Sequence, residues 1–569
     1  MYAYPLYPQR NTCSLDGIWQ FTLLDKSLHL TSAIKPSGIV YNDVLPVPGC
    51  FDATFKYTGI RGLAAYKRTV KVAVPGKYRL ILHAIGLAGK VFCNDEELFY
   101  SQCPWSQHSV EFTVDSDSFE LTILVDNRIR PDESATVLFQ PNYDFYGYGG
   151  IYRSVELEKL PENGHFERVK VETLDLNGKV KVSGKYTQEL SELQIAFDDG
   201  DFVRITSGFA GKAFEFEAQV PDPELWSPEN PRLHTIRVKS NSDEIIEQFG
   251  LRTVKAENGK ILLNDQEIRL IGYNRHDMHP QLGPAVSDSV WIEDLQLLKD
   301  LNCNFIRGAH YQQSQRFLDL CDQLGFLVWE ESLGWGNRKL VVENSDFIDL
   351  QLQQTRHMVE VSCNHPSVIM WGFTNEISDN EESGDSLVRK LAATIRQCDQ
   401  SRLVTMATMF IKTSLSLDVF DVISFNAYPG WYEIDNPDDP HPLSRVAEVL
   451  DGIADKLDSD GHTAKPIIIS EIGAGALYGW RDRARSFWSE EYQADYLTEV
   501  CQYFSSKTRF NGVALWHFAD AKTYSATAGV MGRPRTFNNK GTLNEYRRPK
   551  LAYDRVKEEF GKIKTSNGK

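Results

Sequence analysis

The sequence lacks several features that mark whole classes of protein. Its 569 residues contain no run of about 18 or more apolar side chains, so no membrane-spanning helix is predicted. Its nine cysteines are scattered and none forms a C-x-x-C pair, which argues against a zinc site and a disulfide framework. The segment from Met1 to Arg10 does not resemble a signal peptide, since no basic region precedes an apolar one. These absences favour a reducing, cytoplasmic location.

The sequence also has fewer basic than acidic residues. The chain has 61 Lys and Arg residues against 78 Asp and Glu residues, which gives a formal net charge of −17. Nucleic-acid binding needs a basic surface, so this balance argues against it. An anionic small molecule would need a local cation at its binding site to overcome the overall negative field.

Short alternating runs separated by turn residues fill the first part of the chain. Tyr66–Val74, Tyr78–His83 and Glu120–Val125 have the pattern of strands that bury one face. Their spacing is typical of a β-sandwich, which we place at residues 1–162.

A second β-rich block follows, with Val169–Thr173 and His234–Val238 as predicted strands. Its length of roughly 90 residues suits an immunoglobulin-like sandwich. We place this second sandwich at residues 163–257.

From residue 258 to residue 569 the pattern changes to buried strand-like runs that alternate with amphipathic segments. Ser289–Leu301 and Gln315–Leu324 are predicted helices, and Gly325 closes the second. Eight strands with helices between them predict a (β/α)8 barrel. The eight runs are Ile268–Gly272, Asn304–Arg307, Phe326–Glu330, Val368–Phe373, Leu403–Met406, Val422–Phe425, Pro466–Ser470 and Gly512–Trp516.

Polar side chains follow most of these strands. Active sites of such barrels lie at the carboxyl ends of the strands, so these residues are expected to converge in one mouth. A single strand-end carboxylate is as often a structural partner as a functional group, but a convergent set favours function. The set comprises Asn274, Arg275, His276, His310, Tyr311, Asn375, Glu376, Asn426, Tyr428, Tyr432, Glu471, Trp516 and His517.

Two carboxylates of this set, Glu376 after strand four and Glu471 at the end of strand seven, are predicted to face each other. Glycoside hydrolysis uses such a pair: one protonates the leaving oxygen, and the other attacks the sugar or activates water. Asn375 is suited to donate to a sugar hydroxyl and Tyr428 to donate to Glu471. Trp516 offers an apolar platform for a pyranose. This chemistry needs no metal or cofactor.

Two motifs around the pair carry a family resemblance. Asn364–Glu376 resembles the acid/base signature of glycoside hydrolase family 2, and Ile469–Gly473 resembles its nucleophile segment. The resemblance covers nearly the whole chain, with two sandwiches and a barrel in the family's order. It implies a retaining mechanism, with Glu376 as acid/base and Glu471 as nucleophile.

The resemblance also implies a jelly-roll, sugar-binding-like first domain and a homo-oligomer, either a dimer or a tetramer. Asp144, within Tyr143–Arg153, matches the acidic residue that this domain extends towards the sugar. Within the family, the chain resembles the bacterial β-glucuronidases most.

Phe537–Gly541 points to the substrate. Asn538 and Lys540 are two residues apart, so their side chains project to one side of an extended segment. An ammonium with an amide donor beside it suits a carboxylate. The pair resembles the Asn-x-Lys element with which β-glucuronidases hold the sugar carboxylate, and Tyr432 matches a Tyr that reaches the same group. The expected substrate is a small-molecule or oligosaccharide β-glucuronide.

Three alternatives remain open. Asn274–Pro280 resembles a β-galactosidase segment, which leaves β-galactosidase and β-galacturonidase activity as rivals. A non-catalytic carbohydrate-binding protein is a more remote one. His310 and His276 are interpreted as donors to sugar hydroxyls and not as metal ligands. Arg533 and Arg535 add positive charge without an assigned role.

Overall fold

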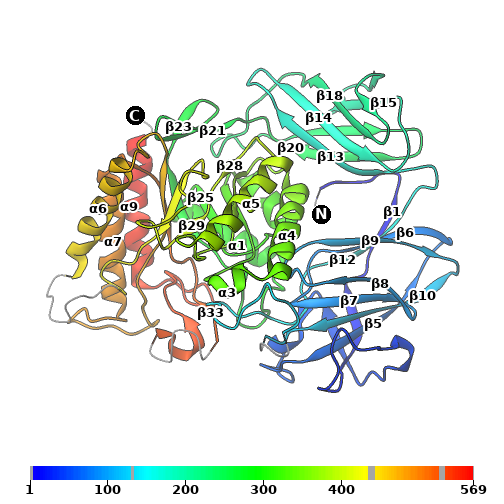
Figure 1. Ribbon diagram of the computed structural model, residues 1–569, viewed down its shortest axis with the longest axis horizontal. Helices are drawn as coiled ribbons and strands as arrows, with labels where there is room; N and C mark the ends of the chain where they lie inside the picture. Colours follow the sequence, from blue (N-terminus) through cyan, green and yellow to red (C-terminus); the bar gives the residue numbers. More distant parts are fainter. Residues whose placement is uncertain (1–3, 130–133, 433–441, 525–531, 568–569) are drawn as a thin grey trace.

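The computed structural model describes residues 4–129, 134–432, 442–524 and 532–567. Two β-sandwiches lie beside a larger α/β body (Figure 1); the first is drawn in blue, the second in cyan, and the α/β body in green to red. The predicted fold class is therefore confirmed. The predicted boundaries after residues 162 and 257 stay a prediction.

The first sandwich packs a four-stranded sheet, in the order β1-β12-β6-β9, against a six-stranded sheet, in the order β3-β2-β5-β10-β7-β8. Because successive side chains of a strand point to opposite faces, Leu80 and Leu82 of β6 share one face and pack with Leu121 and Ile123 of β10 in one apolar core. The strands are β1 Asn11–Ser14, β2 Gly17–Leu23, β3 Asp43–Val47, β4 Gly49–Cys50, β5 Leu63–Lys71, β6 Gly76–Leu82, β7 Ala88–Cys93, β8 Glu96–Ser101, β9 His108–Val114, β10 Ser118–Asp126, β11 Gly150–Ile151 and β12 Val155–Lys159. Short 3-10 turns lie at Pro36–Gly38 and Phe51–Ala53.

The second sandwich has two four-stranded sheets, β13-β14-β18-β17 and β16-β15-β19-β20, and a three-stranded sheet, β21-β22-β23, leads from it into the barrel. Phe166 and Val182 of one sheet share a core with Ile236 and Val238 of the other. The strands are β13 Phe166–Thr173, β14 Lys179–Tyr186, β15 Leu193–Phe197, β16 Val203–Ile205, β17 Phe209–Ala210, β18 Ala213–Gln219, β19 His234–Lys239, β20 Glu244–Phe249, β21 Val254–Glu257, β22 Lys260–Leu263 and β23 Gln266–Ile268.

The barrel sheet is parallel throughout, in the order β28-β27-β26-β25-β24-β32-β31-β30-β29. All eight predicted runs coincide with strands, but the fifth is divided into β28 and β29. The first half pairs with β27 and the second half with β30, and the two residues between them, Thr405 and Met406, belong to neither strand. The strands are β24 Leu270–Asn274, β25 Phe305–Gly308, β26 Leu327–Ser332, β27 Val368–Phe373, β28 Leu403–Val404, β29 Ala407–Thr408, β30 Ile423–Asn426, β31 Ile467–Ile472 and β32 Phe510–Leu515.

Helices cover the outside of this sheet, and a short antiparallel ribbon, β33 Ala521–Lys522 with β34 Phe537–Asn538, follows the last barrel strand. Gly325 ends α2 in the left-handed conformation, as the sequence predicted. None of the described helices is long and apolar enough to cross a membrane. The helices are α1 Asp288–Asp300, α2 Gln315–Leu324, α3 Lys339–Val342, α4 Ser345–Ser362, α5 Glu382–Cys398, α6 Arg445–Ser459, α7 Glu490–Ser506 and α9 Leu551–Asn567, with 3-10 turns at Pro442–Ser444 and Pro534–Thr536.

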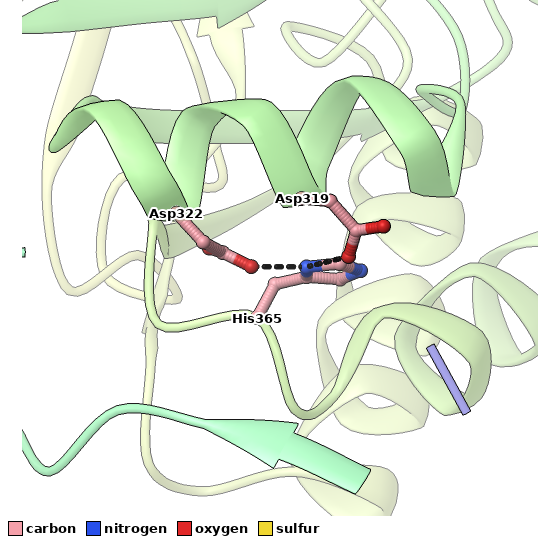
Figure 2. Close-up of side chains that lie close together, drawn as sticks. All are labelled: Asp319, Asp322 and His365. Atoms are coloured by element: carbon pink, nitrogen blue, oxygen red, sulfur yellow. Dashed lines mark hydrogen bonds and ion pairs between the residues drawn. The ribbon is translucent and has the colours of Figure 1, made fainter. Parts of the chain in front are cut away.

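A buried ion pair fastens α2 to the segment that precedes β27 (Figure 2). Nδ1 of His365 lies 2.5 Å from Oδ2 of Asp322 and 4.0 Å from Oδ1 of Asp319. Burial lowers the pKa of His365, but the two carboxylates outweigh it and raise that pKa to about 9. The imidazolium therefore donates from both nitrogens, to Asp322 and, through Nε2 at 3.1 Å, to Gln315. In this state the cluster is an ion pair that joins α2 to the segment before β27.

Replacement of His365 by alanine is expected to lower the free energy of unfolding near pH 7 by about 3–5 kcal/mol, because it leaves buried carboxylates unpaired. The contribution of the imidazolium is fully present below about pH 6.5, the ordinary value, and is lost as the pH rises through about 9. Urea unfolding at several pH values measures both effects. A variant as stable as the parent protein at pH 7 would contradict this account.

Candidate active site

Most of the predicted strand-end residues lie at the carboxyl end of the barrel sheet, but Arg275 instead donates to Asp294 of α1 at 2.8 Å. Glu376 follows β27, and Glu471 lies in β31. Asn426, at the end of β30, donates from its side-chain nitrogen to Oε1 of Glu376 at 2.8 Å and to Asn375 at 3.1 Å. These contacts join the ends of β27 and β30 into one polar site.

Glu471 is held at both carboxylate oxygens. Nη1 of Arg307 donates to Oε1 at 2.8 Å. The Tyr428 hydroxyl donates to Oε2 at 2.7 Å, and this second contact is the one that the sequence predicted. Glu471 is only 3% exposed, and burial raises its pKa, while Arg307 and Tyr428 act in the opposite direction. Two donors on a single carboxylate stabilise its ionised form.

Arg307 is the central residue that the sequence did not single out. Its guanidinium donates to Glu331 at 2.6 Å, to Asn274 at 2.9 Å and to Asn375 at 2.9 Å, besides Glu471. It is fully buried at 0% exposure. An arginine within an apolar strand-like run was the available signal, because a buried guanidinium requires several acceptors.

Glu376 has a different environment. Its backbone is in the left-handed region, with φ of 53°, which is uncommon for a residue with a side chain and typical of functional sites. Burial, followed by the nearby charge of Glu471, raises the pKa of Glu376 to about 7. Glu376 has no cation bound to its carboxylate among the described residues, whereas Glu471 has Arg307. The proton therefore resides on Glu376, and the negative charge on Glu471.

The rate of hydrolysis is expected to fall as the pH rises above about 7, by about tenfold per pH unit in kcat/KM, because Glu376 must carry a proton to act as an acid. The hydrogen bond from Asn426 lowers the Glu376 pKa. In an Asn426→Ala variant, the decrease of kcat/KM at alkaline pH should therefore begin at a higher pH. A pH–rate profile of both proteins tests this, and a decrease that begins at a lower pH in Asn426→Ala would contradict it.

Three further predicted residues line the same mouth. His310 stacks on Trp516 with ring centroids 5.2 Å apart, and its Nδ1 donates to Glu331 at 3.1 Å. Burial lowers the pKa of His310 well below its ordinary value, so its ring is neutral. Nε2 of His310 and Nδ2 of Asn375 are buried without a hydrogen-bond partner in the part of the chain that the structure describes. These polar atoms are suited to bind sugar hydroxyls.

A cationic corner lies at the other side of the site. Nζ of Lys540 donates to the Tyr432 hydroxyl at 2.6 Å, and Arg533 lies 3.3 Å from the same oxygen. Lys540 is 2% exposed, and burial lowers the pKa of its ammonium. The corner therefore presents two cationic side chains and a phenol.

Asp144 reaches this corner from the first sandwich. Its carboxylate accepts from Nε of Arg533 at 2.7 Å, from Nδ2 of Asn538 at 2.9 Å and from the Thr523 hydroxyl at 3.1 Å. A cavity of about 450 Å³ beside it is also lined by Arg533 and Arg338. The structure thus gives Arg533, which the sequence left unassigned, an acidic partner. Arg535 instead pairs with Glu545 at 3.0 Å, away from Asp144.

Comparison with known proteins agrees with this site. The family description "Glycosyl hydrolases family 2, TIM barrel domain" matches residues 254–565, which is more than half of the chain, and "Glycosyl hydrolases family 2" matches residues 155–252. The chain belongs to glycoside hydrolase family 2. It is accordingly a glycoside hydrolase.

Family members of known sequence or structure resemble the chain along its whole length. A β-glucuronidase of Streptococcus agalactiae is 26% identical over 98% of this chain and 97% of its own. The crystal structure of a β-galacturonidase from Eisenbergiella tayi bound to galacturonate is 32% identical, with a TM-score of 0.87 over 97% of this chain and 98% of that one. A β-glucuronidase structure from Ruminococcus gnavus is 25% identical, with a TM-score of 0.86 over 98% of this chain and 100% of that one.

Proposed function

We propose that this family 2 hydrolase is a retaining β-glucuronidase that releases glucuronic acid and an alcohol from β-D-glucuronides. The observation that carries the proposal is the cationic corner of Lys540, Arg533 and Tyr432 beside the carboxylate pair. Two cations and the carboxylate of Asp144 leave one positive charge, which matches one uronate carboxylate. The named β-glucuronidases among the relatives support the same substrate class.

In the first step, an oxygen of Glu471 forms a bond to the anomeric carbon while the bond to the leaving oxygen breaks. Glu376 gives its proton to that oxygen, and the alcohol departs. In the second step, water attacks the anomeric carbon, its proton passes to Glu376, and the bond to Glu471 breaks. Arg307 and Tyr428 hold the Glu471 carboxylate in position throughout.

A second candidate, β-galacturonidase activity, is favoured by one observation. The galacturonidase structures are 31–32% identical to this chain, whereas the β-glucuronidase structures are 22–25% identical. Both substrates carry the same carboxylate and differ in the orientation of one hydroxyl. The cationic corner therefore supports uronides in general and does not select between these two.

A panel of aryl β-glycosides tests the proposal: glucuronide, galacturonide, galactoside, mannoside and glucoside at equal concentration. The glucuronide should give the highest kcat/KM. A preference for galacturonide would replace the first candidate by the second, and a preference for any neutral glycoside would refute both.

We also propose that the enzyme is a cytoplasmic homo-oligomer, a dimer or a tetramer. All nine cysteines are free, which supports a reducing compartment. Light scattering coupled to size exclusion tests the assembly, since a mass of 64.7 kDa would mean a monomer.

A further inference from the structure

Arg61, on the first sandwich, contacts Tyr524, which lies two residues beyond β33 of the antiparallel ribbon whose second strand, β34, precedes Lys540. Its Nη2 donates to the Tyr524 hydroxyl at 3.3 Å, and its Nη1 donates to the backbone oxygens of Asn127 at 3.0 Å and Gly147. The guanidinium also lies over the Tyr146 ring, 4.3 Å from its centroid. One side chain therefore holds two loops of its own domain and one residue of the barrel.

Tyr524 receives a second hydrogen bond from the same loop. The Gly147 N–H donates to its hydroxyl at 2.8 Å, and the rings of Tyr146 and Tyr524 are 4.9 Å apart. Asp52, which is 0% exposed, lies 3.6 Å from Arg61 and accepts from the Gly149 N–H at 3.0 Å. The loop at 146–149 is thus held by contacts with Asp52, Arg61 and Tyr524.

The same loop extends the ribbon. The Tyr146 N–H donates to the Lys522 oxygen at 2.9 Å, and Lys522 in turn pairs with Phe537 across β33 and β34. Ala521 pairs with Asn538, so the ribbon sets the backbone of that residue. A displacement of the loop would be transmitted through these pairs to the Asn538–Lys540 segment.

We propose that Arg61 and Tyr524 form an interdomain clamp through which the first sandwich places the uronate-binding residues Asn538 and Lys540. In this role Arg61 and Tyr524 are positioning residues, because the described contacts join them to each other and to the loop at 146–149, and not to the Glu376 and Glu471 carboxylates. The inference rests on the proposed uronidase function. It predicts that loosening the clamp impairs recognition of the sugar acid more than the bond-breaking chemistry.

The test compares Arg61→Ala, Tyr524→Phe and the parent enzyme on 2,4-dinitrophenyl β-D-glucuronide and on the matching β-D-glucoside. Misplacement of a positioned group by about 1 Å can cost about 10²-fold. Arg61→Ala should therefore lower the ratio of kcat/KM between glucuronide and glucoside by about tenfold or more, chiefly through KM for the glucuronide. Tyr524→Phe, which keeps the ring but removes the acceptor for Gly147 and Arg61, should lower the ratio less.

Arg68→Ala is the matched control. Arg68 is also a half-buried arginine of the first sandwich, but its Nη1 donates to Leu15 at 2.8 Å and Asp16 at 3.0 Å within its own domain. Its ratio should equal that of the parent. Equal losses of kcat/KM on the glucuronide and the glucoside in Arg61→Ala would overturn the proposed clamp. If Arg61→Ala does not fold, an unchanged ratio of the two kcat/KM values in Tyr524→Phe would overturn it. A parent enzyme that prefers the glucoside refutes the proposed function instead.

Discussion

Replacement of Glu471 by glutamine is expected to abolish turnover of an aryl β-glucuronide, with a loss in kcat of about 10⁴-fold or more. At about 1.36 kcal/mol per tenfold, this corresponds to about 5.4 kcal/mol of lost transition-state stabilisation. The amide cannot form the glycosyl-enzyme ester, so the first step has no nucleophile. Release of the chromophore at saturating substrate measures the loss, and the absence of a pre-steady-state burst identifies the missing step.

Folding has to be separated from chemistry in this variant. Glu471 is buried close to Glu376, and removal of its charge also removes the repulsion that raises the Glu376 pKa. A thermal melting curve of the variant shows whether it folds, and its Glu376 should titrate at a lower pH. Glu448→Gln, on the exposed face of α6, controls for the loss of a carboxylate as such. Retention of more than a tenth of the parent kcat would rule out Glu471 as the nucleophile.

Replacement of Lys540 by alanine is expected to lower kcat/KM on a glucuronide by about 10²-fold, or about 2.7 kcal/mol. The loss arises because a buried uronate carboxylate would then lack a charge-assisted donor. Turnover of neutral glycosides should change little, since the ammonium lies in the cationic corner with Tyr432 and Arg533 and not at the Glu pair. The measurement is kcat/KM on matched aryl glucuronide and glucoside.

Lys557→Ala supplies the control for Lys540. Lys557 is exposed on α9 and pairs with Asp300 at the end of α1 at 2.7 Å, outside the cationic corner. It should leave both substrates unaffected. Equal losses on glucuronide and glucoside in Lys540→Ala would argue that Lys540 supports the fold and does not select the substrate.

The barrel could be predicted because each of its parallel strands is buried on both faces. Such strands appear as continuous apolar runs, and all eight runs coincide with observed strands. The division of the fifth strand could not be predicted, because it lies where the chain changes its pairing partner from β27 to β30. The observed strand ends differ from the predicted ones by up to about three residues. For example, the predicted run begins at Tyr66, but β5 begins at Leu63, because Leu63–Ala65 also pair with β10.

The site divides in the same way. Glu376, Glu471 and Lys540 lie within short motifs, so the residues next to them in the sequence were enough to predict their roles. Arg533 and its partner Asp144 are separated by 389 positions, and no local pattern records a contact over that distance. Arg307 was hidden for a related reason, since its acceptors come from four other segments of the chain. Roles for these two arginines required the three-dimensional structure.

The ribbon of β33 and β34 separates the residues for sugar recognition from the residues for bond cleavage. Glu471 lies on a parallel barrel strand and Glu376 follows another, where a change in one strand disturbs its neighbours. The residues proposed to bind the sugar acid, Arg533 and Lys540, flank the second strand of this antiparallel ribbon, which is joined to the first sandwich through Tyr146 and Asp144. Substitutions or insertions there can alter which sugar is accepted while the bond-breaking machinery stays intact. The ribbon is therefore the part of this enzyme best suited to redesign of its substrate range.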